Sequence, residues 1–182
     1  KYLNELLREA DTSIVGIWDT DVIVPNDQID CSIADIRNGK AVMSFPYDGH
    51  FNFCSMEDSF IFRDNRLIEF LKGKEHSDCF IHSVGGAFLV HKDNYLEAGG
   101  ENEHFYGWGP EDAERVRRME ILGYPVGVNT EGPLYHLWHP RGDNSRFFNR
   151  QLASNSRLEL IRICNMDIKE LTDDVASWRN RK

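Results

Sequence analysis

Apolar residues recur along this chain in two kinds of pattern, and stretches of one kind alternate with stretches of the other. Spacings of three and four, as in Leu3, Leu6 and Leu7, predict helices, whereas the apolar run of residues 13–18 predicts a strand buried on both faces. Helices are expected over residues 2–9, 26–38, 58–72, 92–98, 111–122, 149–166 and 167–178, the third of them broken near residues 63–65. Strands are expected over residues 13–18, 41–45, 124–129 and 132–136.

Two further regions do not fit either pattern along their whole length. Residues 51–56 show no clear periodicity and are expected to be irregular. Residues 77–90 carry Gly85-Gly86 between two apolar stretches, which predicts a strand, a close backbone approach to something bulky, and a return strand.

Strands that alternate with helices predict an α/β layered architecture. The composition agrees, since 41% of the 182 residues are hydrophobic and 28% are charged, as in ordinary globular domains. We expect a single domain over residues 1–182, of which residues 149–182 form C-terminal helices. Asp167 and Glu170 match the capping box that opens a helix. No run approaches the ~20 apolar residues of a membrane-spanning helix.

The charge balance narrows the class of partner. Asp and Glu total 30 against 21 Lys and Arg, a net charge of −9, which argues against nucleic acid as a partner. A negatively charged substrate would need a local counter-charge, and a divalent metal held by carboxylates supplies one. The four cysteines form no C-x-x-C pair, and we expect them to be reduced and structural.

Asp19 and Asp21 follow the first apolar run, at the sheet edge where open α/β proteins bind ligands. Two carboxylates separated by one residue can face one hard divalent cation and leave positions open for water and phosphate oxygens. The alternative is a solvated turn after a strand, because a chain this rich in Asp contains such a pair by chance.

His136 and His139 follow the last predicted strand in an aromatic segment. Their spacing allows both imidazoles to approach one ion, or one to bind an ion while the other packs. An ordinary core or surface histidine is the alternative for either residue.

An aromatic and glycine-rich loop leads into the helix that Glu111 and Asp112 open. Aromatic faces stack on sugar rings, and adjacent carboxylates bind or deprotonate hydroxyl groups. We therefore expect substrate contacts from Tyr106, Trp108 and Gly109. The alternatives are helix capping for the carboxylates and core packing for Trp108.

Four segments together carry a family resemblance: Trp18-Asp19-Thr20-Asp21, Gly85-Gly86-Ala87-Phe88, residues 106–112 and Tyr135-His136-Leu137-Trp138-His139. In this order they resemble the GT-A glycosyltransferases, above all the C-terminal galactosyltransferase region of the β-1,4-galactosyltransferases and the bacterial chondroitin-type polymerases. The resemblance covers roughly residues 13–144. It implies the GT-A fold of nucleotide-diphospho-sugar transferases, a Rossmann-like layered sheet with flanking helices.

In that family an Asp-x-Asp motif binds Mn²⁺, so the resemblance assigns Asp19 and Asp21 to the metal, with Asp21 the more direct ligand and Mg²⁺ also compatible. A histidine completes the coordination sphere. The chondroitin-polymerase pattern points to His136 and the galactosyltransferase pattern to His139, and of the two we favour His136.

The resemblance also implies roles for the loop and the helix that follows it. Asp112 is similar to the family's general base, and Glu111 to the residue that holds the acceptor sugar. Trp108 looks like the tryptophan that stacks on substrate. Gly85 and Gly86 resemble a pair whose bare backbone lets the sugars approach.

The implied reaction is an inverting, metal-dependent transfer of galactose or an N-acetylhexosamine from a UDP-sugar donor to a carbohydrate acceptor, a glycan or polysaccharide. The lack of a transmembrane stem and of paired cysteines favours a bacterial cytoplasmic enzyme, with peripheral association at the inner face of the membrane also open. Pro110 departs from the family, since galactosyltransferases carry Gly there, and it stiffens the loop.

GT-A domains normally begin with a half that binds the nucleotide base, whereas here a single helix precedes the Asp-x-Asp strand. We expect this N-terminal nucleotide-binding half to be missing from the chain and supplied in cis by a longer enzyme or in trans by a partner. The third option is a protein that no longer binds a nucleotide sugar.

Two rival functions remain. A metal-dependent phosphoesterase or nucleotidyltransferase would use Asp19, Asp21 and a histidine around the ion and would need no acceptor sugar. A non-catalytic carbohydrate-binding module would keep the Trp108 loop and bind sugar regardless of metal.

Overall fold

The computed structural model describes residues 2–76, 79–106, 109–140, 142 and 149–179. The helices in these ranges are α1 (Tyr2–Glu9), α2 (Asn26–Arg37), α3 (Met56–Asn65), α4 (Ile68–Lys72), α5 (Lys92–Glu97), α6 (Glu111–Ile121), α7 (Arg150–Cys164) and α8 (Ile168–Arg179). The strands are β1 (Ile14–Trp18), β2 (Val22–Ile23), β3 (Met43–Phe45), β4 (Phe51–Phe53), β5 (Cys79–Phe80), β6 (Ala87–His91), β7 (Val126–Val128) and β8 (Leu134–His136).

The strands form two mixed sheets of four strands each, ordered β1-β6-β3-β7 and β2-β8-β4-β5. In the first sheet β6 lies between antiparallel neighbours, and β3 pairs with β7 in parallel. In the second sheet β8 pairs with β2 antiparallel and with β4 in parallel. β1 and β2 are consecutive in the chain, so the short turn between them joins the two sheets and carries Asp19 and Asp21.

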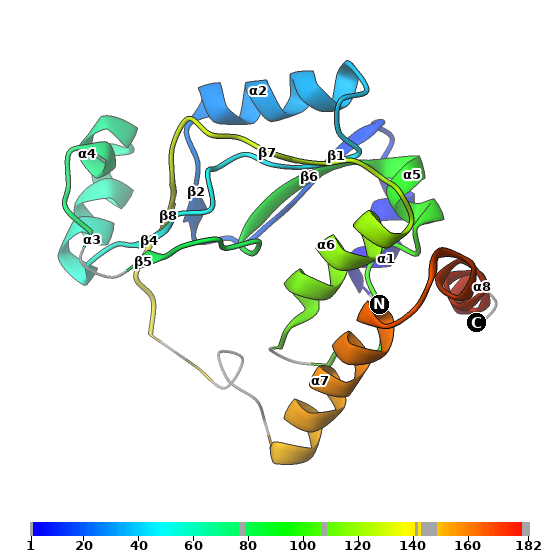
Figure 1. Ribbon diagram of the computed structural model, residues 1–182. Helices are drawn as coiled ribbons and strands as arrows, with labels where there is room; N and C mark the ends of the chain where they lie inside the picture. Colours follow the sequence, from blue (N-terminus) through cyan, green and yellow to red (C-terminus); the bar gives the residue numbers. More distant parts are fainter. Residues whose placement is uncertain (1, 77–78, 107–108, 141, 143–148, 180–182) are drawn as a thin grey trace.

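Helices cover the first sheet on both faces, which gives the layered α/β arrangement (Figure 1). α2 packs on β3, β6 and β7, while α5 and α6 lie on the opposite side of the sheet with α1 beside α5. α7 and α8 pack against α6 and not against the strands. The main core between these layers includes Met43, Val90 and Met119, which have no exposed surface, and the equally buried rings of Tyr47 and Tyr95.

Most predicted elements are present, with ends shifted by a few residues. The predicted break in the third helix is confirmed, although it falls at Arg66 and Leu67, between α3 and α4. The predicted capping box is also confirmed. The Asp167 N–H donates to Glu170 Oε2 at 3.0 Å, and the Glu170 N–H donates to Asp167 Oδ1 at 2.8 Å.

Three expectations were wrong. Residues 51–56 are not irregular, because Phe51–Phe53 form β4, which gains backbone partners from β8 and β5. Strands do lie on both sides of Gly85-Gly86, as β5 and β6, but the second does not return alongside the first, since β5 pairs with β4 in one sheet and β6 lies in the other. β1 is half-buried, with Gly16 exposed, because it is an edge strand with β6 as its one neighbour.

The four cysteines are free thiols, and only Cys54 among them is buried. Within the described ranges, no helix combines the length and the apolar character needed to cross a membrane.

Candidate functional site

The turn between β1 and β2 is shaped by backbone hydrogen bonds at both of its ends. The Asp19 N–H donates to the Gly86 carbonyl at 2.8 Å, and the Val22 N–H donates to the Asp19 carbonyl at 3.1 Å. β2 then pairs with β8 so that Val22 faces His136, and the Leu137 N–H donates to the Asp21 carbonyl at 2.8 Å. The strand pairing therefore places Asp21 beside the histidine segment, although 115 positions of sequence separate Asp21 from His136.

Asp21, His136 and His139 could hold one metal ion and are called the metal-ligand triad below, because one ligand atom from each residue lies within 4.8 Å of the others. Asp21 Oδ1 is 3.7 Å from His136 Nε2, and Asp21 Oδ2 is 3.2 Å from His139 Nε2. The sequence left open which histidine approaches the aspartate, and in the structure both do. Two imidazoles and a carboxylate are a donor set that suits Mn²⁺ and other divalent transition metals.

The hydrogen bonding of His139 fits a ligand role. His139 Nδ1 is 3.0 Å from the Pro140 carbonyl, which only accepts, so Nδ1 carries the proton. The other ring nitrogen, Nε2, lies 3.2 Å from Asp21 Oδ2. A backbone partner on one nitrogen is typical of metal-binding histidines, which bind the ion through the other.

Asp19 is not one of the three residues of the triad, but it lies in the same turn as Asp21. Burial raises the pKa of Asp19, as do the charges of Asp112 and Asp21, and the cation of Arg115 opposes this effect. The N–H of Asp19 donates to the Gly86 carbonyl, and Asp112 rests against the neighbouring Gly85, so this turn and the first turn of α6 approach each other at the glycine pair. Its assignment as a metal ligand stays a prediction.

Asp112 lies in the first turn of α6, where its carboxylate is held from two sides. Arg115 Nη1 donates to Asp112 Oδ1 at 2.6 Å, and the side chain of Asp112 keeps 41% of its surface exposed. On the other side Asp112 Oδ2 rests against the backbone of Gly85, where a Cβ atom would come within 2.5 Å of this oxygen.

Glu111, the neighbour of Asp112, has an unusual environment. Burial and the charge of Asp112 raise the pKa of Glu111 to about 7, against the opposing effect of Arg115. Its Oε2 atom is buried and has no hydrogen-bond partner among the residues that the structure describes. A carboxyl group with this pKa exchanges protons near neutral pH.

The structure describes only some of the other residues that were predicted to contact the substrate. Gly107 and Trp108 lie outside the described residues, so the tryptophan prediction stays a prediction. Tyr106 is 69% exposed at the start of this loop, and Gly109 follows it just before α6. Gly86 has a φ angle of +79°, and a Cβ there would meet core side chains, with Phe51 at 2.8 Å.

Gly85→Ala is expected to lower the free energy of unfolding by about 1 kcal/mol, because the new methyl group must displace the Asp112 carboxylate from Arg115. Urea unfolding at pH 7 measures this loss. Gly142→Ala is the matched control, since a Cβ at Gly142 meets nothing within 4 Å. Equal stability of the two variants would contradict the close packing of Asp112 on Gly85.

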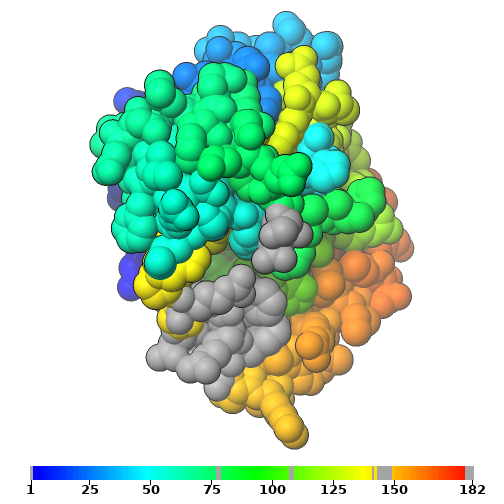
Figure 2. Space-filling view, turned by 90° about the vertical axis from the view of Figure 1, so that its left-hand side faces the viewer, coloured from blue at the N-terminus to red at the C-terminus, as the bar shows by residue number. Residues whose placement is uncertain are grey.

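Two cavities adjoin the triad, and His139 lines both of them. One of about 760 Å³ is rich in aromatic side chains and includes Phe53, Phe80, Trp138 and both histidines of the triad. The other, of about 790 Å³, reaches Asp21 and His139 and is lined by Arg63 and Arg66. Figure 2 looks onto this side of the molecule, where α3, α4 and the segment after β8 reach the surface together.

Four of the lining residues, Arg63, Arg66, Phe53 and Phe80, carry no signal in the local sequence pattern. Arg63 and Arg66 lie at the end of α3, and Arg63 Nη2 donates to the Trp138 carbonyl at 3.2 Å. Phe53 and Phe80 belong to β4 and β5 of the second sheet. Phe53 could have been placed near the histidines only by predicting that β4 pairs with β8. That pairing joins residues more than eighty positions apart in the sequence.

Two comparisons with known proteins bear on this site. Residues 71–140 match a family model described as the N-terminal domain of galactosyltransferase. The chain is also similar to beta-1,4-galactosyltransferase 7 of Drosophila melanogaster, with 29% identity over 96 residues. That similarity covers 48% of this chain and 29% of the fly protein, so the chain matches less than a third of the length of this relative.

The matched range contains Gly85-Gly86, the Glu111-Asp112 pair and the two histidines of the triad. The mixed sheets with their covering helices are consistent with a GT-A-like domain. The chain is therefore similar to galactosyltransferases over part of its length, and its fold is consistent with that likeness.

Proposed function

We propose that this chain carries the catalytic centre of an inverting, metal-dependent glycosyltransferase that uses a UDP-sugar donor. One observation carries the proposal: Asp112 Oδ2 rests against Gly85, and the carbonyl of the next residue, Gly86, accepts from the N–H of Asp19 in the turn that also carries Asp21 of the triad. A metal site next to an exposed carboxylate is the arrangement that glycosyl transfer from a nucleotide sugar needs.

The residues fit a divalent cation, with Asp21, His136 and His139 as its ligands and Asp19 close by. When bound there, Mn²⁺ or Mg²⁺ would offset the negative charge that grows on a diphosphate leaving group. Arg63 and Arg66 line the cavity beside Asp21, and guanidinium groups suit phosphate oxygens. We assign the diphosphate of the donor to this side of the triad.

Asp112 is the base in this proposal. Its exposed carboxylate removes the proton from an acceptor hydroxyl as that oxygen attacks the anomeric carbon of the donor sugar, and the bond from that carbon to the diphosphate breaks. A single displacement inverts the anomeric configuration. Glu111 is placed to bind a second hydroxyl of the acceptor through its unpartnered Oε2 atom.

The donor sugar we propose is galactose or an N-acetylhexosamine, and the acceptor is a carbohydrate. The test is titration calorimetry of UDP, UDP-galactose and UDP-N-acetylgalactosamine into the protein and into a version extended at its N-terminus, each with and without Mn²⁺, followed by transfer assays on a panel of glycans. We expect metal-dependent binding of UDP that appears or strengthens in the extended version, and a product of inverted configuration.

Other outcomes of the same assays identify the rival functions. Hydrolysis of phosphate esters without an acceptor would favour a phosphoesterase. Sugar binding that survives EDTA and Asp112→Asn would favour a carbohydrate-binding module. Either result, combined with no binding of UDP, would contradict the transferase proposal.

Asp21→Asn is expected to weaken Mn²⁺ binding at least about 10- to 100-fold, because the loss of a direct ligand should cost no less than the loss of an outer-shell partner. Calorimetric titration with MnCl₂ measures the affinity. Asp48→Asn is the matched control, since Asp48 Oδ1 contacts His50 Nδ1 at 2.9 Å outside the triad. Equal weakening in both variants, or in neither, would contradict the triad as the metal site.

A further inference from the structure

Arg115 is a buried cation placed at the carboxylates of the site. Its side chain is 5% exposed, and its guanidinium carbon lies 4.4 Å from the centre of the Phe88 ring. Nη1 donates to Asp112 Oδ1 at 2.6 Å, while Nε and Nη2 donate to the two carboxylate oxygens of Glu101 at 3.2 and 2.8 Å. The guanidinium group therefore joins two carboxylates in a fixed geometry.

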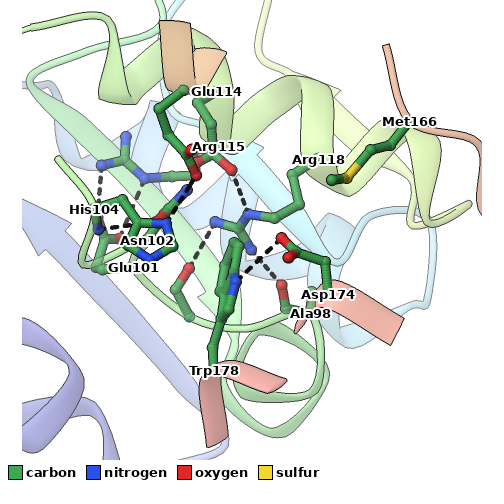
Figure 3. A network of polar contacts seen from close by, with 12 residues as sticks. Ala98, Glu101, Asn102, His104, Glu114, Arg115, Arg118, Met166, Asp174 and Trp178 are labelled. Carbon is green, nitrogen blue, oxygen red and sulfur yellow. Dashed lines mark hydrogen bonds and ion pairs between the residues drawn. The ribbon is translucent and has the colours of Figure 1, made fainter. Parts of the chain in front are cut away.

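Glu101 is itself held by hydrogen bonds, so its carboxylate fixes the position of the Arg115 guanidinium group. Glu101 Oε1 accepts from the hydroxyl of the fully buried Tyr95 at 2.6 Å, and the Glu101 N–H donates to Asn4 Oδ1 at 2.8 Å. Burial alone would raise the pKa of Glu101, but Arg115 lowers it below its ordinary value, so the carboxylate stays charged. Figure 3 shows Glu101 and Arg115 within this network.

Asp112 has little freedom between these contacts. Oδ1 is held by Arg115, and Oδ2 packs on the backbone of Gly85, which fixes the plane of the carboxylate. The side chain is nevertheless 41% exposed, so without Arg115 it can rotate into solvent. Repulsion from Glu111 and Asp19 would favour that rotation, because both lie close enough to feel the charge of Asp112.

We propose that Arg115 is a positioning residue that holds the Asp112 carboxylate toward the acceptor site, and that Glu101 anchors Arg115 for this purpose. The proposal rests on the proposed function, in which Asp112 is the base. Arg115 touches neither the metal-ligand triad nor a substrate in this arrangement, and it acts through Asp112.

The test combines kinetics with a double-mutant cycle. Arg115→Met is expected to lower kcat about 10- to 100-fold with little change in the KM of the UDP-sugar, because a displaced base costs turnover more than donor binding. In the Asp112→Asn background the same substitution should have no further effect, since the group that it positions is already inactive. Arg115→Lys should recover part of kcat relative to Arg115→Met. The single ammonium group of lysine can donate to Asp112, but it cannot reproduce the fixed geometry of the several guanidinium donors.

Arg117→Met is the matched control, because Arg117 lies on the same helix and pairs with Glu120 in an exposed contact. It should leave kcat unchanged. A loss of kcat in Arg115→Met that persists undiminished in the Asp112→Asn background would overturn the positioning role.

A crystal structure of Arg115→Met gives a readout that does not depend on activity. We expect the Asp112 carboxylate to move away from Gly85, and an unmoved carboxylate would overturn the proposal. If the wild-type protein transfers no sugar while Asp112 moves as expected, the proposed function fails and the structural role of Arg115 stands. These two failures are therefore distinguishable.

Discussion

Asp112→Asn is expected to lower kcat for sugar transfer by about 10²- to 10⁴-fold, the range that general acid–base catalysis contributes. The amide keeps the shape of the side chain and can still accept a hydrogen bond from Arg115, but it cannot take a proton from the acceptor hydroxyl. Steady-state kinetics with a UDP-sugar donor and Mn²⁺ measure the effect. Binding of the metal and of UDP should change little, since Asp112 is not part of the triad.

Asp173→Asn is the control, because Asp173 is an exposed carboxylate on α8 and should leave kcat unchanged. Glu111→Gln provides the informative comparison. If Glu111→Gln loses kcat by the larger factor and Asp112→Asn does not, the base is Glu111, whose pKa of about 7 suits proton transfer near neutral pH. That result would contradict the role of Asp112 and also remove the basis for positioning by Arg115.

The helices were more predictable than the strands, and the reason is local. α2, α6 and α7 each repeat their apolar positions over three or more turns, so the helical spacing of these positions is visible in the sequence without knowledge of the fold. β2 and β5 have two residues each, too few to show an alternation. Whether such a pair of residues forms a strand depends on a partner elsewhere in the chain.

The same limit applies to the site. Asp21 and His136 were candidate metal ligands from their places at strand ends, and the resemblance to the GT-A glycosyltransferases assigned them to the metal. The structure brings them together because β2 pairs with β8. Arg63 and Arg66 come from the end of a helix in the segment between β3 and β6. Nothing in their local pattern separates them from solvated surface arginines.

At Gly85 the predicted close approach is confirmed, but the group that makes the approach differs from the one that the sequence suggested. The sequence predicted a close approach at the Gly85-Gly86 pair, and close approaches occur at both positions. The group that approaches Gly85 is the carboxylate of Asp112, and the groups that approach Gly86 are core side chains such as Phe51. Access of a sugar to this backbone stays a prediction, and the bare Cα atom of Gly85 already has a structural role.

The helix that carries Asp112 is secured by Arg118, which has no exposed surface. Arg118 Nε donates to Glu114 Oε1 at 2.8 Å, Nη2 donates to the Gly100 carbonyl at 2.6 Å, and Nη1 donates to the Ala98 carbonyl. The ring of Trp178 from α8 lies beside the guanidinium group, as Figure 3 shows.

Arg118→Met is expected to lower the free energy of unfolding by about 3–5 kcal/mol, because it leaves the carboxylate of Glu114 buried without a partner. The side chain of Glu114 is 2% exposed, so water cannot replace the lost donor without local opening of the packing. Two backbone carbonyls lose their donors as well. Urea unfolding at pH 7, followed by circular dichroism, measures the change.

A double variant separates the cost of the unpaired charge from the loss of packing. Adding Glu114→Leu to Arg118→Met should recover a large part of the stability, because a buried ion pair replaced by apolar side chains is often close to neutral. Arg117→Met controls for the loss of a cation from α6 and should cost less than about 0.5 kcal/mol, as its pair with Glu120 is exposed. If Arg118→Met costs no more than this control, α6 is held by its apolar contacts, and the buried ion pair does not determine where Asp112 lies.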